Sequence, residues 1–219
     1  MLQDIRLICL MLLMFVSGQR LANGEGTPGE FDFYVLALSW SPTYCDDNGA
    51  NDPQQCGIGK RFGFVLHGLW PQYEKGYPSE CSSTQMPDKV TAEFPGLYPN
   101  DKLYRHEWEK HGTCSGLTPK QYLALSKTLK ESVNIPKAYR KPEKPLRVTT
   151  DEIAAAFQSS NPTFEHASFA VYCADSGRFL REILVCFDQD GRPISCSNDI
   201  RRKAAKSCQQ PTLLIKNVR

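Results

Sequence analysis

The stretch FDFYVLALSW, residues 31–40 of this 219-residue chain, combines aromatic and branched apolar side chains with a single charge. This pattern predicts a buried β-strand. A second strand is predicted at Arg61–Leu66 (RFGFVL), where large apolar side chains alternate along the segment. Because His67 and Gly68 follow at once, we expect the imidazole of His67 at a strand end, where it can face a cleft.

The rest of the chain mixes helical and extended patterns. Helices are predicted at Asn100–Gly112, Thr118–Val133 and Thr149–Ser159, each opened by an N-cap signal. Further strands are predicted at Ser168–Cys173, Phe179–Phe187 and Pro193–Cys196. The segments 41–53 and 134–147 are rich in turn residues or proline and are predicted to be loops. Since no regular β-α-β order is present, we expect an α+β fold with helices packed on a central antiparallel sheet.

The N-terminus has the features of a secretory signal peptide. Leu7–Val16 is an apolar run of ten residues, which is too short for a membrane span of about 20 residues. Small residues follow it, so we expect residues 1–24 to be a signal peptide cleaved between positions 18 and 24. Residues 25–219 would then form one domain of a secreted or periplasmic protein. No second run reaches membrane length, and we expect a monomer.

The cysteines agree with export. Cys9 lies in the signal segment, and eight cysteines remain, an even number that fits a disulfide framework in an oxidising compartment. Cys186 and Cys196 flank the turn signal Asp190-Gly191, so we pair them. A bridge between Cys45 and Cys56 would close a short loop. Four cysteines are then left to pair: Cys81, Cys114, Cys173 and Cys208.

The net charge limits how the protein can hold a charged partner. The formal net charge is +2, and residues 1–24 contribute two arginines and one aspartate, which leaves +1 without them. Binding of nucleic acid must therefore depend on local groups of positive charge and not on the net charge of the protein. The predicted loop 134–147 carries five positively charged side chains. They indicate a solvated surface or, alternatively, a surface that attracts the RNA backbone. These residues are Lys137, Arg140, Lys141, Lys144 and Arg147.

Two of the four histidines lie in one short segment, HEWEKH, residues 106–111. On a helix with 100° per residue, His106, Glu107, Lys110 and His111 fall within one 140° arc. Such a face is often only solvated. A zinc site of the H-E-x-x-H type is disfavoured, because Lys110 occupies the position of the second histidine ligand. Two rare histidines beside a carboxylate and an ammonium instead indicate a catalytic face.

His67 strengthens that interpretation, although a histidine packed in the core is the alternative. Trp70 and Tyr73 follow it within reach of a stacked base. Two imidazoles and a cation suit RNA cleavage, in which the 2′-hydroxyl is the nucleophile. One histidine can take its proton, the other can protonate the leaving 5′-oxygen, and no metal is required. His166 has no evident partner in the sequence, and we expect it to be structural.

The segments FVLHGLWPQ (residues 64–72) and HEWEKHGTC (106–114) resemble the two active-site segments of the ribonuclease T2 family, in the same order. This family comprises secreted transferase-type ribonucleases. The likeness extends to the opening FDFYVLALSWSPTYC (31–45) and to the late cysteines, and so covers most of the mature chain. The opening stretch is most similar to the bacterial branch.

This resemblance implies a role for each residue of the catalytic face. His67 matches the general acid and His111 the general base. Glu107 and Lys110 match the transition-state stabilisers, and His106 matches the phosphate-binding histidine. The resemblance further implies an endoribonuclease that forms 2′,3′-cyclic phosphate ends, with little base specificity, no cofactor and often an acidic optimum. It also supports the bridges Cys81–Cys114, Cys173–Cys208 and Cys186–Cys196.

The predicted substrate-binding residues are Trp70, Gln72 and Tyr73. Trp70 matches the aromatic residue of the first base site in the family. Gln72 is a departure, because some members carry an acidic residue there that helps to select a base. Two other functions stay open from the sequence. One is a metal-dependent hydrolase, and the other is an inert RNA-binding or toxin-like protein of the same fold.

Overall fold

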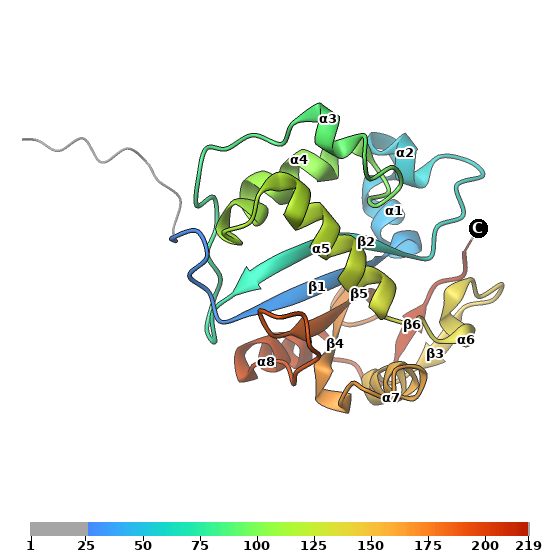
Figure 1. Ribbon diagram of the computed structural model, residues 1–219. Coiled ribbons are helices and arrows are strands. Elements are labelled where there is room, and N and C mark those ends of the chain that lie inside the picture. Colours follow the sequence, from blue (N-terminus) through green and yellow to red (C-terminus); the bar gives the residue numbers. More distant parts are fainter. Residues whose placement is uncertain (1–25, 219) are drawn as a thin grey trace, which may run out of the picture.

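The computed structural model describes residues 26–218, and Figure 1 shows the arrangement of its elements. The strands are β1 Phe33–Trp40, β2 Phe64–Gln72, β3 Leu146–Val148, β4 Phe169–Ala174, β5 Phe179–Phe187 and β6 Leu213–Ile215. The α-helices are α1 Ser41–Asn48, α2 Pro53–Cys56, α3 Asp88–Thr91, α4 Asp101–Lys110, α5 Pro119–Ser132, α6 Lys137–Arg140, α7 Thr150–Ser160 and α8 Asn198–Ser207. The predicted signal segment, residues 1–24, lies outside the described residues.

All six strands form one sheet in the order β2-β1-β5-β6-β3, with β4 paired to β5. The pairs β1–β2, β1–β5, β4–β5 and β3–β6 are antiparallel, and only the short contact between β5 and β6 is parallel. The predicted α+β fold with a central antiparallel sheet is therefore confirmed.

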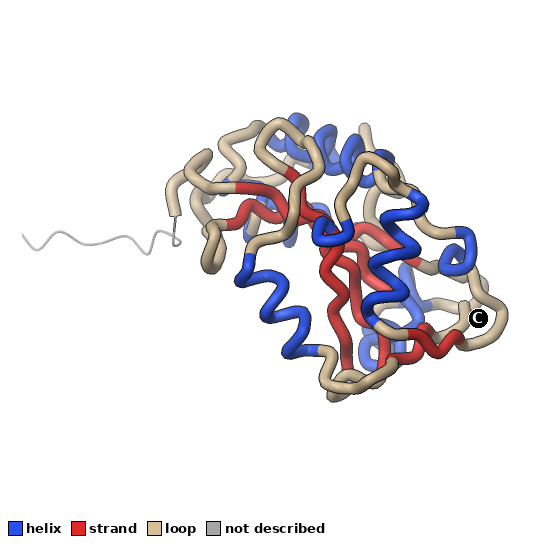
Figure 2. Tube along the Cα trace, turned by 90° about the horizontal axis from the view of Figure 1, so that it is seen from below, coloured by secondary structure: helices blue, strands red, loops and turns tan. Residues whose placement is uncertain are grey.

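β1 is buried on both faces, as its apolar sequence predicted. Tyr34, Leu36, Leu38 and Trp40 enter the larger core, which also holds residues of α5 and α7. The alternate residues of β1 enter a smaller core that α8 covers. Helices consequently flank the strands on both sides, as Figure 2 shows. This burial fixes the register of β1 and, through it, the position of β2.

β2 is longer than predicted. The strand expected at 61–66 runs from Phe64 to Gln72, so His67 lies inside the strand and not at its end. Pro71 does not end the strand, because β2 is the edge strand of the sheet. A proline on an edge strand gives up a backbone N–H that no neighbour needs.

Several other predictions need correction. The predicted loop 41–53 contains α1, whose first turn holds Pro42, and the predicted loop 134–147 contains α6 and β3. The predicted strand Pro193–Cys196 is reduced to a single bridge between Pro193 and Phe187. Four further elements, α2, α3, α8 and β6, were not predicted from the sequence.

The four bridges are Cys45–Cys56, Cys81–Cys114, Cys173–Cys208 and Cys186–Cys196, and all four pairings are confirmed. Each bridge typically adds about 2–4 kcal/mol by restricting the unfolded chain. Within residues 26–218, every helix is too short or too polar to cross a membrane.

Candidate active site

A β-bulge in β2 presents His67. Leu38 of β1 pairs with Leu66 and Ala37 pairs with Gly68, so His67 is the extra residue between two successive pairs. A bulge re-aims the side chain of the extra residue. Here it places Nε2 of His67 3.8 Å from Oε1 of Glu107 on α4.

Glu107 is the centre of the site. Its side chain is only 1 % exposed, and its Oε2 accepts a hydrogen bond of 2.7 Å from Nε1 of Trp70. Its Oε1 also lies 4.0 Å from Nε2 of His106. Gly68 makes room for this arrangement, because a Cβ there would lie 1.9 Å from Oε2 of Glu107 and 2.3 Å from the indole nitrogen of Trp70.

A second carboxylate holds His67 from the other side. Nδ1 of His67 lies 3.2 Å from Oε2 of Glu182, a buried residue of β5. Ser39 of β1 also donates to Oε2 of Glu182, over 3.4 Å. A carboxylate accepts hydrogen bonds, so this contact keeps a proton on Nδ1 of His67 and leaves Nε2 facing Glu107.

His111 lies just beyond the end of α4. The predicted helix Asn100–Gly112 starts at its N-cap Asn100 as expected, but it ends at Lys110, and His111 has a non-helical backbone. The residue is 6 % exposed, and its imidazole packs against Trp70 and Tyr77, with ring centroids 5.3 and 5.9 Å away. Nδ1 of His111 makes no hydrogen bond to any described residue.

Both predicted catalytic histidines contact the same indole, that of Trp70. The ring centroid of His67 lies 5.1 Å from that of Trp70, on which the imidazole of His111 also packs. The structure therefore brings together the histidine of β2 and the histidine that follows α4, although they are far apart in the sequence.

The surroundings drive the pKa values of the two imidazoles in opposite directions. Burial lowers the pKa of His111 to about 3, and the positive charges of Lys110, His67 and His106 add to this effect. Burial alone would also lower the pKa of His67, but the hydrogen bond to Glu182 and the charges of Glu107 and Glu182 together raise it above 6.5. The surroundings thus favour the neutral form of His111 and the protonated form of His67.

The pKa of Glu107 is raised to about 7, chiefly by burial. The charge of His67 and the hydrogen bond from Trp70 oppose this rise but do not cancel it. Below neutral pH a large share of Glu107 is therefore uncharged. The pKa of His106 is lowered, first by the partial loss of solvent around its half-exposed side chain and then by the charge of Lys110.

The remaining predicted catalytic residues form the rim of this site. His106 lies in the last turns of α4 with a side chain that is largely exposed. Lys110 is the last residue of α4, and its carbonyl accepts a hydrogen bond from the N–H of Glu80. This contact fastens the loop 73–86 to the end of the helix.

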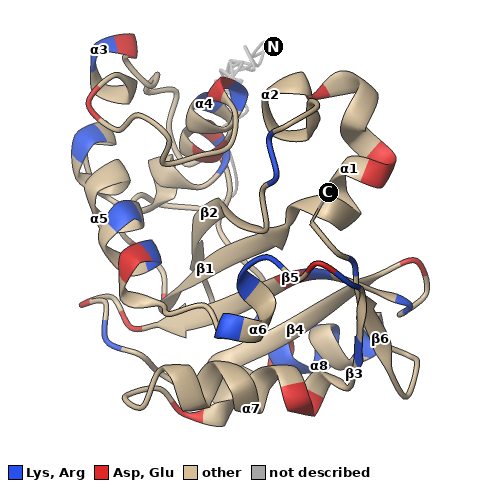
Figure 3. Ribbon diagram, turned by 90° about the vertical axis from the view of Figure 1, so that its right-hand side faces the viewer, with Lys and Arg blue, Asp and Glu red and all other residues tan. Residues whose placement is uncertain are grey.

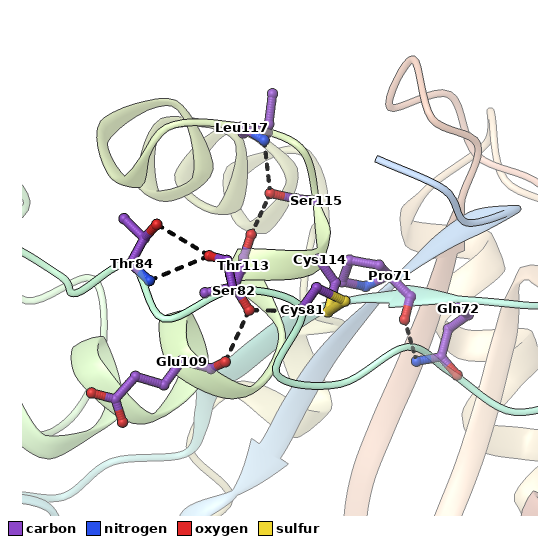
Figure 4. The surroundings of a disulfide bond; sticks show 11 residues. Pro71, Gln72, Cys81, Ser82, Thr84, Glu109, Thr113, Cys114, Ser115 and Leu117 are labelled. Atoms are coloured by element: carbon purple, nitrogen blue, oxygen red, sulfur yellow. Dashed lines mark hydrogen bonds between the residues drawn. A yellow bond between two sulfur atoms is a disulfide. The ribbon is translucent and has the colours of Figure 1, made fainter. Parts of the chain in front are cut away.

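The predicted base-binding residues differ in their surroundings. Trp70 is half-buried and belongs to the site, whereas the side chain of Gln72 is buried and its Nε2 donates to the carbonyl of Pro71 (Figure 4). Tyr73 packs against the larger core. Tyr77, which was not predicted from the sequence, is 47 % exposed and contacts His111.

The disulfide Cys81–Cys114, whose surroundings Figure 4 shows, lies three residues after His111 in the chain. Thr113, next to Cys114, donates from Oγ1 to the carbonyl of Glu109, and Ser115 donates to the carbonyl of Gly112. These bonds and the bridge fix the turn that carries His111. In the described part of the chain, no three His, Cys, Asp or Glu side chains gather as they would around a metal ion.

Comparison with known proteins identifies the family of this chain. The model of the Ribonuclease T2 family matches residues 31–196. A ribonuclease of Aeromonas hydrophila is 39 % identical over 224 aligned residues, which cover 97 % of each chain. The chain belongs to the Ribonuclease T2 family.

Solved structures of T2-type ribonucleases show the same fold. Trichomaglin, described as an S-like ribonuclease, is 26 % identical, with a TM-score of 0.64 over 76 % of this chain and 92 % of its own. Ribonuclease MC1 from bitter gourd seeds is 23 % identical, with a TM-score of 0.60 over 74 % of this chain and 92 % of its own.

Sequence reasoning missed three residues of the site, namely Glu182, Tyr77 and Gly68. Glu182 is a lone acid in the apolar strand FLREILVCF, and a buried charge in such a strand is a signal that a partner is present. Tyr77 lies between Gly76 and Pro78 in a loop, where an aromatic side chain can stay exposed. Nothing in the sequence alone places Gly68 against a carboxylate.

Proposed function

We propose that this chain is an endoribonuclease that cleaves single-stranded RNA by metal-independent transesterification, through 2′,3′-cyclic phosphate ends. Ribonuclease activity follows from family membership and from the near full-length match to a ribonuclease. The proposed mechanism rests on one observation. Two imidazoles with opposite pKa shifts contact one indole, beside a carboxyl group that is mostly neutral below pH 7.

His111 is the proposed general base. Its low pKa keeps it neutral over most of the pH range, so it can take the proton of the 2′-hydroxyl. The 2′-oxygen then bonds to phosphorus while the bond to the 5′-oxygen breaks. His67, whose protonated form is favoured by its raised pKa, gives its Nε2 proton to that leaving oxygen. In the second step His67 takes a proton from water, the water oxygen bonds to phosphorus while the bond from phosphorus to the 2′-oxygen breaks, and His111 returns its proton to that 2′-oxygen. This restores both protonation states.

Glu107, Lys110 and His106 are the proposed stabilisers of the transition state. A protonated Glu107 can donate a hydrogen bond to a phosphate oxygen without repelling it. Lys110 adds positive charge next to it, and donors fixed in position before the reaction stabilise developing charge effectively. Glu182 is proposed as a positioning residue, since it contacts His67 at Nδ1, the ring nitrogen that does not face Glu107.

Trp70 and Tyr77 are proposed to hold the base that precedes the scissile bond. Stacking on an aromatic ring contributes about 1–3 kcal/mol per base, and every base can stack. Stacking therefore supports low base specificity. Direct contacts of Gln72 or Tyr73 with a base remain predictions from the sequence.

Residues 1–24 are proposed to be a signal peptide and residues 25–219 a single ribonuclease domain that acts as a monomer outside the cytoplasm. The four disulfides agree with an oxidising compartment. Mass measurement of the exported protein tests this, since the mature chain should start between residues 19 and 25.

A digest of polymeric RNA and DNA in excess chelator separates the candidate functions. We expect cleavage of RNA only, with 2′,3′-cyclic phosphate ends and full activity in the chelator. A metal-dependent hydrolase would lose activity in chelator and regain it with added zinc. An inert binding protein would retain RNA without cutting it.

A further inference from the structure

We propose that a cationic pocket at the start of β2 binds a phosphate of the RNA chain on the 3′ side of the scissile bond. The pocket has a volume of about 250 Å³, and its lining includes Lys60, Arg61, Arg140 and Lys141 together with Phe62 and Phe64. No carboxylate lines it. This inference rests on the proposed function and extends it to a subsite away from the reacting phosphate.

The charges of the pocket are available to a ligand. Within residues 26–218, Lys60, Arg61 and Lys141 form no ion pair, and all four cations are exposed. Arg140 donates from Nε to the carbonyl of Ile135, which orients the guanidinium and leaves its terminal nitrogens to bind a ligand. Cations without protein partners release counterions when they bind phosphates, and this release drives the binding of nucleic acids.

The fold holds the two basic segments side by side, although they are far apart in the sequence. Figure 3 shows basic residues in the segment before β2 and in α6. Gly63 makes this approach possible, because a Cβ there would lie 2.4 Å from the carbonyl oxygen of Arg140 and 3.2 Å from the ring of Trp40. Arg61 has a φ of 46°, in the left-handed region, where the chain turns into β2.

The position of the pocket favours the 3′ side of the substrate. Phe64 lines the pocket and begins β2, and His67 follows three residues later, about 10 Å along a strand. His67 is the proposed acid for the leaving 5′-oxygen. The first nucleotide after the scissile bond is therefore expected to lie next to His67. Trp70, Tyr77 and His111 occupy the opposite direction along β2, where the preceding base is proposed to stack.

The test uses chimeric oligonucleotides with one ribonucleotide in a DNA strand, so that each has one cleavable bond. One substrate carries four further nucleotides on the 3′ side, a second carries four on the 5′ side, and a dinucleoside monophosphate carries no second phosphate. The variant is Arg61→Gln/Lys141→Gln. The matched control is Arg201→Gln/Lys206→Gln, which removes one exposed arginine and one exposed lysine from α8, on the other face of the sheet.

We expect kcat/KM of Arg61→Gln/Lys141→Gln to fall about tenfold on the 3′-extended substrate only, with the control unchanged. The slope of log(kcat/KM) against log[salt] should become shallower by about 0.7 for each phosphate that the variant no longer neutralises. Equal kinetics for variant and control would overturn the proposal. Slower cleavage of the dinucleotide, or of the 5′-extended substrate, would also overturn it.

Binding of an uncleavable 2′-O-methyl oligonucleotide separates this inference from the proposed function. Weaker binding by Arg61→Gln/Lys141→Gln than by the control supports the pocket even if the chain cuts no RNA. Gly63→Ala keeps every charge but pushes the two segments apart, and it should weaken binding in the same way if its thermal unfolding stays cooperative. Unchanged binding by a folded Gly63→Ala would contradict the role given to this close approach.

Discussion

Two histidine–carboxylate pairs in this molecule have the same separation and different surroundings. Nδ1 of His67 lies 3.2 Å from Oε2 of Glu182, and Nε2 of His166 lies 3.2 Å from Oδ1 of Asp151. The carboxylate of Glu182 is 8 % exposed, whereas that of Asp151 is 83 % exposed. The partner of His166 corrects the expectation from the sequence that this histidine has none.

The difference shows that burial gives a histidine–carboxylate contact its effect. Water screens the exposed pair, and such pairs contribute about 0–1 kcal/mol. The buried pair keeps its strength, and Glu107 adds a second carboxyl group 3.8 Å from the other ring nitrogen. His67 is consequently held in one orientation and its protonated form is favoured, as the proposed role of general acid requires.

The largest expected effect is the difference in activity between alanine variants of His67 or His111 and the alanine variant of His166. His67→Ala and His111→Ala should each lower kcat/KM on RNA by at least about a hundredfold, because each removes one proton-transfer step. His166→Ala should leave it unchanged. Turnover of a dinucleoside monophosphate, with circular dichroism to confirm folding, measures the contrast. Comparable losses in all three variants would contradict the assignment.

Gly68→Ala should give the next largest effect. The added Cβ would displace Glu107 and Trp70, which are the closest groups to it. A misplacement of about 1 Å in an active site can cost about a hundredfold in rate. Gly49→Ala is the matched control, since a Cβ there meets only Cys56, at an ordinary 3.8 Å. Full activity of a folded Gly68→Ala would show that the position of Glu107 is not critical.

Glu182→Gln should shift the pH profile of kcat/KM. The proposed mechanism requires protonated His67, so activity falls as the pH rises through the raised pKa of His67, and loss of the proton from Glu107, whose pKa is about 7, adds to the same limb. Removal of the negative charge of Glu182 lowers both pKa values and moves the alkaline limb to lower pH. The acid limb belongs to His111, with a pKa of about 3, and should stay in place. A uniform drop without a shift would indicate a purely structural role.

Asp151→Asn is the counterpart of that variant and should have the smallest effect. The alkaline limb of the pH profile of kcat/KM for Asp151→Asn should coincide with that of the wild type. The free energy of unfolding should fall by less than about 1 kcal/mol, because the exposed pair and a favourable charge at the N-terminus of α7 are removed. Urea unfolding at neutral pH measures it, and a larger fall would mean that the exposed pair is not weak.

Local patterns predicted much of this molecule. The apolar run of β1, the caps Asn100, Thr118 and Thr149, and the bridges Cys45–Cys56 and Cys186–Cys196 match the structure. The pairings Cys81–Cys114 and Cys173–Cys208 were implied by the family resemblance and not by a local pattern. α8 was missed because only Ile200 and Ala204 carry its apolar face. The end of β2 was missed because Pro71 argues against a strand until the strand is known to lie at the edge of the sheet.

The site was predictable where its residues are neighbours in the sequence and not where the sheet joins them. His106, Glu107, Lys110 and His111 form one segment, so their shared location could be inferred from it. Glu182 reaches His67 only because β5 and β2 both pair with β1. The bulge that aims His67 depends on a register that no local pattern encodes.

The most direct test of the two histidine roles varies the leaving group. A uridine 3′-nitrophenyl phosphate releases a nitrophenolate that needs no proton, whereas a dinucleoside monophosphate releases an alkoxide that does. His67→Ala should lose its activity, by about a hundredfold or more, on the dinucleotide but nearly none on the nitrophenyl ester. His111→Ala should lose activity on both substrates. If His67→Ala were equally impaired on both, His67 would not be the general acid.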